Sequence, residues 1–433
     1  DTAELLYVTP ERFANDEFMH QMRAVEVSLF VVDEAHCISS WGHDFRPDYL
    51  RLGSALERLG RPRVLALTAT ASPPVRDEIV SRLRLHDPVQ IVHGFDRPNL
   101  RLSVDSFRAE DRKREAAVLR AMGEQKPGII YTATRKSAET LAAELQDYGL
   151  NAAAYHAGLR AADRESVQDL FLEGRLEVVV ATTAFGMGVD KADVRFVLHA
   201  EVADSLDSYY QEIGRAGRDG GPAEAVLFYR PEDLGLRTFF ASSAPNPDAL
   251  QRVGVLLGHA VDPVDPAELA DLMGISTSRL AGLVNLLEQV GTVHVDETGR
   301  LSAVQGLGTA REAAASAVEL AEARRRVEKS RIEMMRGYAE TQGCRRQYLL
   351  AYFGEAYGEQ CGNCDTCESG TASAQPDAAS SPYALQSRVT HASWGSGLVM
   401  RYEGDRIVVL FEDVGYRTLS LEKVQSSRLL VPA

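Results

Sequence analysis

Long apolar runs and an excess of basic residues are both absent from this 433-residue chain. No stretch of 18 uncharged apolar residues occurs, and the first residues lack the basic and apolar regions of a signal peptide, so we expect a cytoplasmic protein without a membrane partner. The formal net charge of −15 gives no global attraction to nucleic acid. Any nucleic-acid binding must therefore come from local patches and specific contacts.

Cysteine is scarce outside one short segment. Four of the five cysteines, Cys344, Cys361, Cys364 and Cys367, lie within 24 residues, whereas Cys37 stands alone. Such clustering in a cytoplasmic chain favours a metal over disulfides. Four thiolates suit tetrahedral Zn²⁺, since the CxxCxxC loop can place three ligands on one ion and a helix can deliver the fourth. We predict a structural zinc site, with free thiols or a redox role as the alternative.

Short β-rich runs alternate with helical patterns over residues 1–230. The expected strands are LLYV, SLFVV, RVLALTA, PGIIYTA, LEVVVATT and VRFVLHA. This alternation predicts parallel α/β sheets with helices on both faces. The stretch HGFDRPNLRLSV, residues 93–104, is expected to link two such units. Because the chain begins with Asp1 and runs at once into the first strand-like stretch, we expect it to begin within a domain.

The second half of the chain has a different organisation. Residues 248–305 resemble two helices joined by a short turn and followed by a hairpin, which is typical of a winged helix; a plain helical connector is the alternative. Residues 308–368, with the cysteines, are expected to form a helical zinc-binding module. The small and polar residues 369–384 indicate a linker. Residues 385–433 alternate apolar and polar side chains between glycine turns, which predicts a small antiparallel β-barrel.

Two adjacent carboxylates follow the apolar run VSLFVV. In open α/β sheets ligands bind beyond the carboxyl ends of the strands, where Asp33 and Glu34 would project. Asp33 is suited to hold Mg²⁺ through its water shell, and Glu34 to orient and deprotonate an attacking water. A helix-capping Asp-Glu pair is the alternative. The tetrapeptide DEAH after an apolar strand favours a nucleotide-hydrolysis site.

Two arginines occur in the segment QEIGRAGRDG, residues 211–220. Their spacing would place Arg215 and Arg218 on one helical face. Guanidinium groups facing a neighbouring site can neutralise charge on a transferred phosphoryl group. A solvated turn is the alternative. Together with the DEAH segment, the two arginines are expected to form the opposite wall of one interdomain nucleotide site.

Several segments of the chain together carry a resemblance. LLYVTPER, VVDEAHCISSWGHDFRPDY, LALTATA, IIYTATRKSAE, YHAGL, ATTAFGMGVDKADVRFVLH and YYQEIGRAGRDG occur in the order and approximate spacing of RecQ-type DNA helicases. CRRQYLLAYFGE followed by CGNCDTC is similar to the zinc module of that family. The resemblance implies an α/β fold with two RecA-like domains, the rear half of the first in residues 1–97 and a whole second one in residues 98–235.

The resemblance also implies a function: ATP-driven translocation on single-stranded DNA in the 3′ to 5′ direction, with unwinding of duplex DNA in repair and recombination. ATP, Mg²⁺ and Zn²⁺ are the implied cofactors. His36 is expected to couple the nucleotide site to DNA, and Arg218 to act as the arginine finger. The implied catalytic residues are Asp33, Glu34, His36, Gln211, Arg215 and Arg218. Nucleotide contacts are implied for Asp33, Glu34, Gly188, Asp190, Arg215 and Arg218.

An aromatic-rich loop that senses DNA follows the DEAH motif in this family. Here Trp41 and Phe45 offer flat faces for stacking on unpaired bases, with His43 between them, and Arg46 supplies charge for a phosphate. A place in an interdomain core is the alternative for both aromatic residues. Weaker candidates for DNA contacts, which equally fit capping or core positions, are Thr68, Thr70, His156 and Thr183.

The chain departs from the family in three ways. It has no G-x-x-x-x-G-K-[ST] loop, whose amides and lysine cradle phosphates, and no adenine-reading glutamine motif. Both normally lie upstream of the point where this chain begins, so we expect a truncated helicase that is inactive alone, with a degenerate ATPase as the alternative. The winged-helix-like segment precedes the cysteines instead of following them, which puts its grip on duplex DNA in doubt.

The third departure is the end of the chain, which resembles the Tudor- or SH3-like barrels of some other bacterial helicases. It implies a protein partner or a nucleic-acid accessory module, and most of Trp394, Tyr402 and Phe411 are expected in the barrel core. Two competing functions are an RNA helicase of the broader DEAH group and a non-catalytic zinc and winged-helix nucleic-acid-binding protein. The aromatic loop and the cysteines argue against the first, and the intact carboxylates and arginines against the second.

Overall fold

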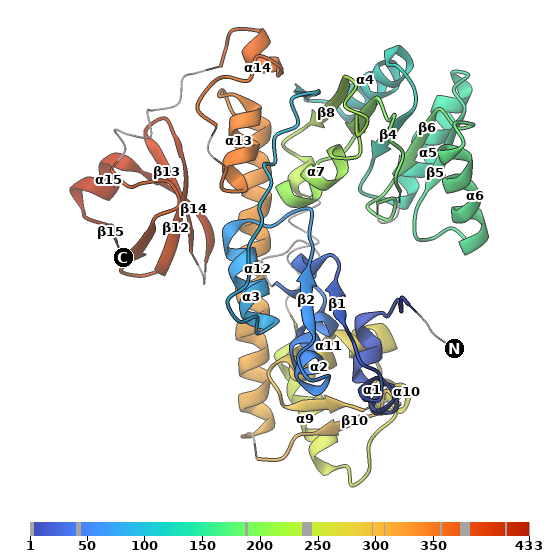
Figure 1. Ribbon diagram of the computed structural model, residues 1–433, viewed down its shortest axis with the longest axis vertical. Coiled ribbons are helices and arrows are strands. Elements are labelled where there is room, and N and C mark those ends of the chain that lie inside the picture. Colours follow the sequence, from blue (N-terminus) through green and yellow to red (C-terminus); the bar gives the residue numbers. More distant parts are fainter. Residues whose placement is uncertain are drawn as a thin grey trace. The chain divides into compact units, whose positions relative to one another are not determined.

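The computed structural model describes residues 4–39, 45–186, 189–235, 245–296, 298–306, 308–355, 357–372, 382–411 and 414–432. The chain divides into two compact units, one made of residues 1–91 and 242–326 and the other of residues 92–241 and 327–433. Figure 1 shows their elements. No helix of the described ranges is long and apolar enough to cross a membrane.

The first unit contains a small α/β part built on two parallel strands. Strands β1 and β2 pair from Leu29↔Arg63 to Val32↔Ala66. The expected strand at residues 5–8 is wrong: this stretch is irregular and largely exposed, because no described strand lies beside it to complete its hydrogen bonds. The elements are η1 (Pro10–Ala14), α1 (Asp16–Arg23), β1 (Leu29–Val32), η2 (Ala35–Ile38), η3 (Pro47–Arg51), α2 (Leu52–Arg58), β2 (Arg63–Ala66) and α3 (Pro73–Arg82).

The two faces of this pair of strands differ in burial. Side chains of one face, including Val32, pack on the core formed with α2 and α3. On the other face Leu29, Val31, Leu65 and Leu67 are 43–49% exposed. Parallel strands are normally covered on both faces. This unit therefore presents an apolar sheet face that nothing in the described part of the unit covers.

Three helices, a hairpin and the first part of the long helix α12 (Ala310–Glu340) complete the first unit. The three helices and the hairpin are α9 (Pro247–His259), α10 (Pro266–Met273), α11 (Thr277–Gln289), β9 (Val293–Val295) and β10 (Leu301–Ala303). Gly274, in the left-handed region at φ 68°, ends α10, and the Ser276 hydroxyl caps α11. Buried leucines and valines of all five elements form one core. The helix-turn-helix and hairpin predicted for residues 248–305 are both present.

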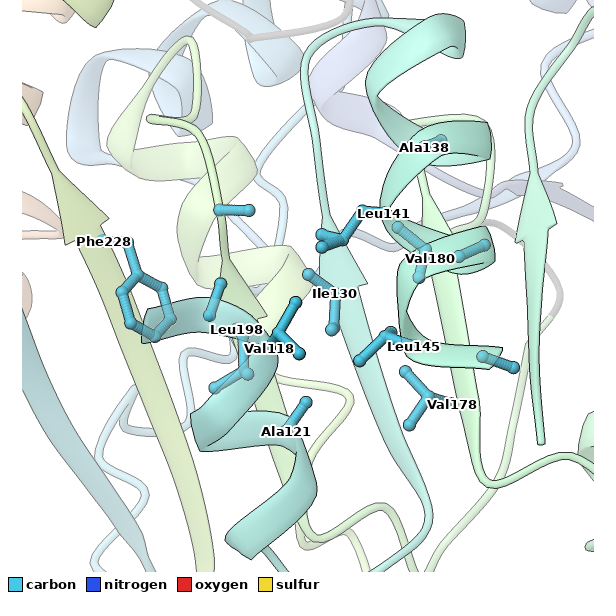
Figure 2. Packing of buried hydrophobic residues seen from close by; sticks show 14 of the residues in the cluster. Val118, Ala121, Ile130, Ala138, Leu141, Leu145, Val178, Val180, Leu198 and Phe228 are labelled. Atoms are coloured by element: carbon cyan, nitrogen blue, oxygen red, sulfur yellow. The ribbon is translucent and has the colours of Figure 1, made fainter. Parts of the chain in front are cut away.

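The second unit is organised around a six-stranded parallel sheet in the order β3-β8-β7-β4-β6-β5. Figure 2 shows α4 and α5 packing Val118, Leu141 and Leu145 against Ile130 and Val180 of the sheet. The elements are β3 (Leu100–Ser106), α4 (Glu110–Gly123), β4 (Gly128–Tyr131), α5 (Arg135–Asp147), β5 (Ala152–Tyr155), α6 (Ala161–Leu172), β6 (Val178–Ala181), β7 (Phe196–His199), α7 (Leu206–Ile213) and β8 (Ala223–Tyr229).

One part of the predicted linker belongs to this sheet. Residues 100–104 lie in β3, which pairs with β8 along its whole length, from Leu100↔Ala223 to Ser106↔Tyr229. The linker prediction is therefore wrong for residues 100–104, which form an edge strand; such a strand tolerates polar residues because one of its sides is open.

The chain ends with a long helix, a cysteine-bearing segment and a five-stranded antiparallel sheet. These comprise α12 (Ala310–Glu340), α13 (Arg345–Tyr352), α14 (Asp365–Glu368), β11 (Arg388–His391), β12 (Gly395–Glu403), β13 (Arg406–Phe411), β14 (Gly415–Ser420), α15 (Leu421–Ser426) and β15 (Leu430–Pro432). The sheet order is β14-β13-β12-β11-β15. Tyr402 and Phe411 are buried in its core, as predicted, and Trp394 packs against that core half-buried.

Candidate nucleotide, nucleic-acid and zinc sites

The DEAH carboxylates lie directly beyond the carboxyl end of β1. Glu34 is in the left-handed region, at φ 47° and ψ 45°, and its backbone N–H donates to Asp33 Oδ1 at 2.9 Å. A non-glycine residue in this region costs on the order of 1–3 kcal/mol and is found most often at functional sites. The turn exposes Asp33 to solvent, whereas the Glu34 side chain is 28% exposed.

His36 connects Glu34 to the TAT segment, residues 68–70. Its Nδ1 lies 3.2 Å from Glu34 Oε2 and 3.0 Å from Thr68 Oγ1, and the ring is almost fully buried. The Thr68 hydroxyl donates to the Thr70 carbonyl at 3.1 Å. It must therefore accept from His36, which places a proton on Nδ1. A continuous chain of polar contacts thus runs from Glu34 through His36 to Thr68 and Thr70.

Tyr49 is a neighbour of this site that the sequence did not single out. Its hydroxyl donates to the Asp33 carbonyl at 3.3 Å. Burial is the main cause that raises the pKa of Tyr49 to about 12, so the phenol is a neutral donor at physiological pH. Tyr49 is the last residue of the segment VVDEAHCISSWGHDFRPDY. No signal in the sequence indicates its contact with Asp33, because no spacing rule predicts a contact between residues sixteen positions apart.

The aromatic loop is described only at its end. Trp41 and His43 lie outside the described residues, and their predicted roles stay predictions. The Arg324 guanidinium lies 4.5 Å from the centre of the Phe45 ring. The Arg46 backbone N–H donates to the Cys37 carbonyl at 2.9 Å. The end of the loop is thus tied to the turn that carries His36.

In the second unit the two arginines lie in a turn and not on a helix. Helix α7 ends at Ile213, and Gly217, at φ 59°, turns the chain so that its N–H reaches the Val194 carbonyl. The prediction that Arg215 and Arg218 share a helical face is therefore wrong. They nevertheless converge, because Nη1 of each lies 3.5 Å from the Val189 carbonyl.

This arginine turn also contacts a predicted site residue. Arg218 Nη1 lies 2.5 Å from Asp190 Oδ1. Arg215 is 8% exposed, and Gln211 is half-buried on α7. Gly188 lies outside the described residues. The structure thus brings Arg215, Arg218 and Asp190 together, with the Arg218 guanidinium paired to the Asp190 carboxylate.

His156 and Thr183 follow neighbouring strands, β5 and β6, at the carboxyl edge of the sheet. His156 is 3% exposed, and its Nε2 lies 3.0 Å from Glu139 Oε1. Its Nδ1 has no hydrogen-bond partner among the described atoms. The side chain of Arg135, the first residue of α5, lies beside Gly158 of the loop that follows His156, and Thr183 is exposed. This edge offers a cation, a hydroxyl and an imidazole to a ligand.

The four clustered cysteines meet at one point. All four Sγ atoms lie within 4.8 Å of one another. A tetrahedral Zn²⁺ with Zn–S bonds of about 2.3 Å requires sulfur atoms about 3.8 Å apart, so the thiols fit this metal. Cys344 and Cys364 are the residues preceding α13 and α14. Cys37 lies in the other unit, as predicted for a residue that is not a ligand.

The cysteine segment also protects the open edge of the sheet. The Leu102 N–H donates to the Asn363 carbonyl at 3.4 Å, and the Val104 N–H donates to Asp365 Oδ2 at 3.1 Å. The Arg345 Nε donates to the other oxygen of Asp365 at 2.6 Å. Zinc binding and the order of β3 are therefore linked through residues between and beside the ligands.

These features define the class of protein: a DEAD/DEAH-type helicase fold with a zinc module. Three family models match in chain order: "DEAD/DEAH box helicase" at residues 1–79, "Helicase conserved C-terminal domain" at residues 113–220 and "RecQ zinc-binding" at residues 307–368.

Curated relatives then give the family. The probable ATP-dependent DNA helicase RecS of Bacillus subtilis is 34% identical over 374 residues, which cover 84% of this chain and 70% of the relative. The ATP-dependent DNA helicase RecQ of Pasteurella multocida is 36% identical over 368 residues, covering 84% of this chain and 46% of the relative. The chain belongs to the RecQ family of helicases, and it spans about half the length of the latter relative.

The comparison with solved structures gives a weaker likeness. The helicase Lhr of Mycobacterium smegmatis, bound to single-stranded DNA and AMP-PNP, is 23% identical with a TM-score of 0.43, and the match covers 72% of this chain and 46% of that one.

Proposed function

We propose that this chain is the part of a RecQ-like helicase that couples ATP hydrolysis to 3′ to 5′ movement on single-stranded DNA and to duplex unwinding. The observation that carries the proposal is the contact chain Glu34–His36–Thr68. It joins the carboxylate suited to activate water to the TAT segment. A shift of Thr68 changes the hydrogen bond of His36 and with it the 3.2 Å contact of His36 Nδ1 with Glu34 Oε2, which is the kind of link that coupling between hydrolysis and DNA binding requires.

The hydrolytic chemistry is assigned to the DEAH carboxylates. Asp33 is exposed and fits a Mg²⁺ ion held through water, because Mg²⁺ retains much of its hydration shell. When bound, Mg²⁺ neutralises charge on the phosphates. Glu34 holds and deprotonates the attacking water, and His36 fixes the orientation of Glu34. Arg218 stabilises the transferred phosphoryl group once it leaves Asp190.

The carboxyl edge of the second sheet is proposed as the DNA-backbone site. His156 brings an unpartnered Nδ1, the start of α5 brings Arg135, and the loop after β6 brings the exposed Thr183 hydroxyl. Phosphate oxygens accept from all three kinds of group. Phe45 and Trp41 supply base stacking. The winged-helix-like segment, with eight acidic side chains against three arginines in residues 248–305, is not assigned a grip on duplex DNA.

We further propose that this chain does not hydrolyse ATP alone. Its 433 residues contain no G-x-x-x-x-G-K-[ST] loop, and the exposed apolar face of β1 and β2 is suited to pack against the rest of such a domain. With ATP, Mg²⁺ and single-stranded DNA, purified chain is expected to bind DNA but release no phosphate above background. Rapid DNA-stimulated phosphate release would overturn this part of the proposal.

The biological setting remains part of the proposal. Zinc-bound thiolates fit a reducing compartment, which supports a cytoplasmic location. A role in DNA repair and recombination is proposed on the resemblance of the chain to RecQ-type DNA helicases. A protein partner for the C-terminal sheet is proposed on its resemblance to Tudor- and SH3-like barrels.

An unwinding assay separates the proposal from its alternatives. The protein translated from the complete coding region is given DNA and RNA duplexes with either a 3′ or a 5′ single-stranded tail. The proposal predicts unwinding of the 3′-tailed DNA duplex. Preference for RNA would favour the broader DEAH group, and binding without unwinding would favour a non-catalytic zinc protein.

A further inference from the structure

The C-terminal sheet buries a charged side chain against the zinc-module helices. Arg401, on β12, is 1% exposed although it lies on the outside of its own sheet. Its guanidinium lies 3.8 Å from the centre of the Tyr348 ring on α13, and Nη2 donates to the Tyr348 hydroxyl at 2.5 Å. Glu403 accepts from Nε at 2.8 Å. A buried guanidinium is tolerated only with such partners.

A β-bulge directs Arg401 toward those helices. Pairing of β12 with β13 shifts register between Val399 and Arg401. Val399 and Tyr402 both point into the core of the sheet, which strict alternation would forbid for residues three apart. The bulge restores the alternation, so Arg401 lies on the opposite face. The local irregularity thus places the Arg401 side chain on the face where α12 and α13 pack.

The backbone of the sheet approaches α12 closely beside this contact. At Gly415, which has φ +74°, a Cβ atom would lie 2.2 Å from the Ser330 Oγ and 3.4 Å from the Val327 Cα. Only glycine allows this approach. The backbone of the sheet thus packs directly against α12. Such close packing is not expected of a module that is attached only through a flexible linker.

Contacts of the C-terminal sheet also extend to α7, the helix that precedes Arg215 and Arg218. The Tyr416 and Tyr352 rings stack at 5.3 Å. The Tyr352 hydroxyl donates to Asp207 in the first turn of α7, and both residues are buried. On the same helix, the Tyr209 hydroxyl lies 3.2 Å from that of Tyr338 on α12. Helix α7 carries Gln211 and leads directly into Arg215 and Arg218.

We propose that the C-terminal sheet is a fixed brace of the second helicase unit, and that it holds α7 in place through Arg401–Tyr348 and Tyr416–Tyr352–Asp207. Arg401, Tyr416 and Asp207 are positioning residues in this scheme. The face that packs on α12 and α13 is occupied within the chain, so an external partner of the sheet must use another face.

The direct test cuts the connection between the zinc module and the sheet. A protease site is inserted between Ala372 and Pro382, the chain is cleaved, and the fragments are run on a native sizing column. The proposal predicts that they co-elute, and separation of the wild-type fragments would overturn it. Arg401→Glu is expected to release the sheet fragment, because it removes the contact with Tyr348 and places a second carboxylate beside Glu403. The matched control Arg406→Glu changes a side chain that is 64% exposed on the neighbouring strand and is expected to leave the fragments together.

Hydrogen exchange then tests the effect on α7. After release of the sheet, amides of Leu206–Ile213 are expected to exchange at least about tenfold faster, while those of α5 stay unchanged, because only α7 loses its brace. Unchanged exchange in α7 after release, or an equal acceleration in α5, would overturn the positioning role, because the proposal confines the change to α7. Neither experiment uses nucleotide or DNA, so its outcome is independent of the proposed helicase activity.

Discussion

At the scale of single residues, the central feature is a threonine hydroxyl shared between a buried histidine and its own loop. Thr68 accepts from His36 Nδ1 and donates to the Thr70 carbonyl. Removal of that hydroxyl takes a partner from the carbonyl of buried Thr70 and leaves His36 Nδ1 only the Glu34 carboxylate at 3.2 Å, which costs more than the loss of a surface hydrogen bond.

Thr68→Val tests this feature because it keeps the shape of the side chain. We expect a loss of about 1–3 kcal/mol in the free energy of unfolding of the first unit, as for a buried polar group left unpaired. In the complete protein, the ratio of DNA-stimulated to basal ATP hydrolysis should fall. Urea unfolding and phosphate release measure the two effects. Thr140→Val, at an exposed hydroxyl bonded to the Lys136 carbonyl, is the control and should change neither.

At the scale of elements, the zinc module secures an edge strand. Residues beside the ligands, Asn363 and Asp365, accept from the N–H groups of Leu102 and Val104 on β3. Loss of the metal should therefore disorder β3 as well as the cysteine loop, because metal binding and local folding are coupled.

Cys361→Ser is expected to abolish binding of the single zinc ion and to lower the melting temperature of the second unit. Metal content by mass spectrometry and a thermal melt measure the two effects. Cys37→Ser, which lies in the first unit, should keep a full equivalent of zinc. Equal zinc loss in both variants would contradict the assignment of the four ligands.

Sequence reasoning worked best where the chemistry is local. The position of the DEAH carboxylates at the end of a strand and the meeting of the four cysteines agree with the structure, because a strand end and a CxxCxxC loop are largely fixed by nearby residues. The roles of the carboxylates stay predictions. The strand predicted at residues 5–8 is absent, because a strand forms only where a neighbouring strand can pair with it. The helix predicted for Arg215 and Arg218 is absent, because the chain turns at Gly217, which has φ 59°. The Tyr49–Asp33 contact depends on turns, and the direction of the Arg401 side chain depends on a β-bulge. Neither feature can be predicted from the hydrophobic periodicity of the sequence.

At the scale of the whole molecule, buried tyrosines connect the sheet, the zinc module and the C-terminal strands of the second unit. Burial is the main cause that raises the pKa of Tyr209 and of Tyr210 to about 12, from an ordinary value of 10. Below pH 10 the phenols are neutral in both the folded and the unfolded chain, so their stabilising contribution is complete. Between pH 10 and 12 only the unfolded chain loses these protons, which favours unfolding.

The free energy of unfolding of the second unit should therefore fall steadily as the pH rises from 10 to 12. Urea unfolding at several pH values, with tyrosinate absorbance as a second probe, measures it. Tyr209→Phe should make the fall less steep, although it also removes the bond to Tyr338. A stability that stays constant up to pH 12 would contradict the assigned burial.

The account rests on Glu34 as the residue that activates water for DNA-dependent ATP hydrolysis. The decisive measurement is phosphate release by the protein translated from its complete coding region, with and without single-stranded DNA, compared for wild type, Glu34→Gln and the surface control Glu17→Gln. The account predicts strong stimulation by DNA in wild type and control, and a loss on the order of a hundredfold or more in Glu34→Gln. Equal activity of Glu34→Gln and wild type, or no response to DNA, would contradict it.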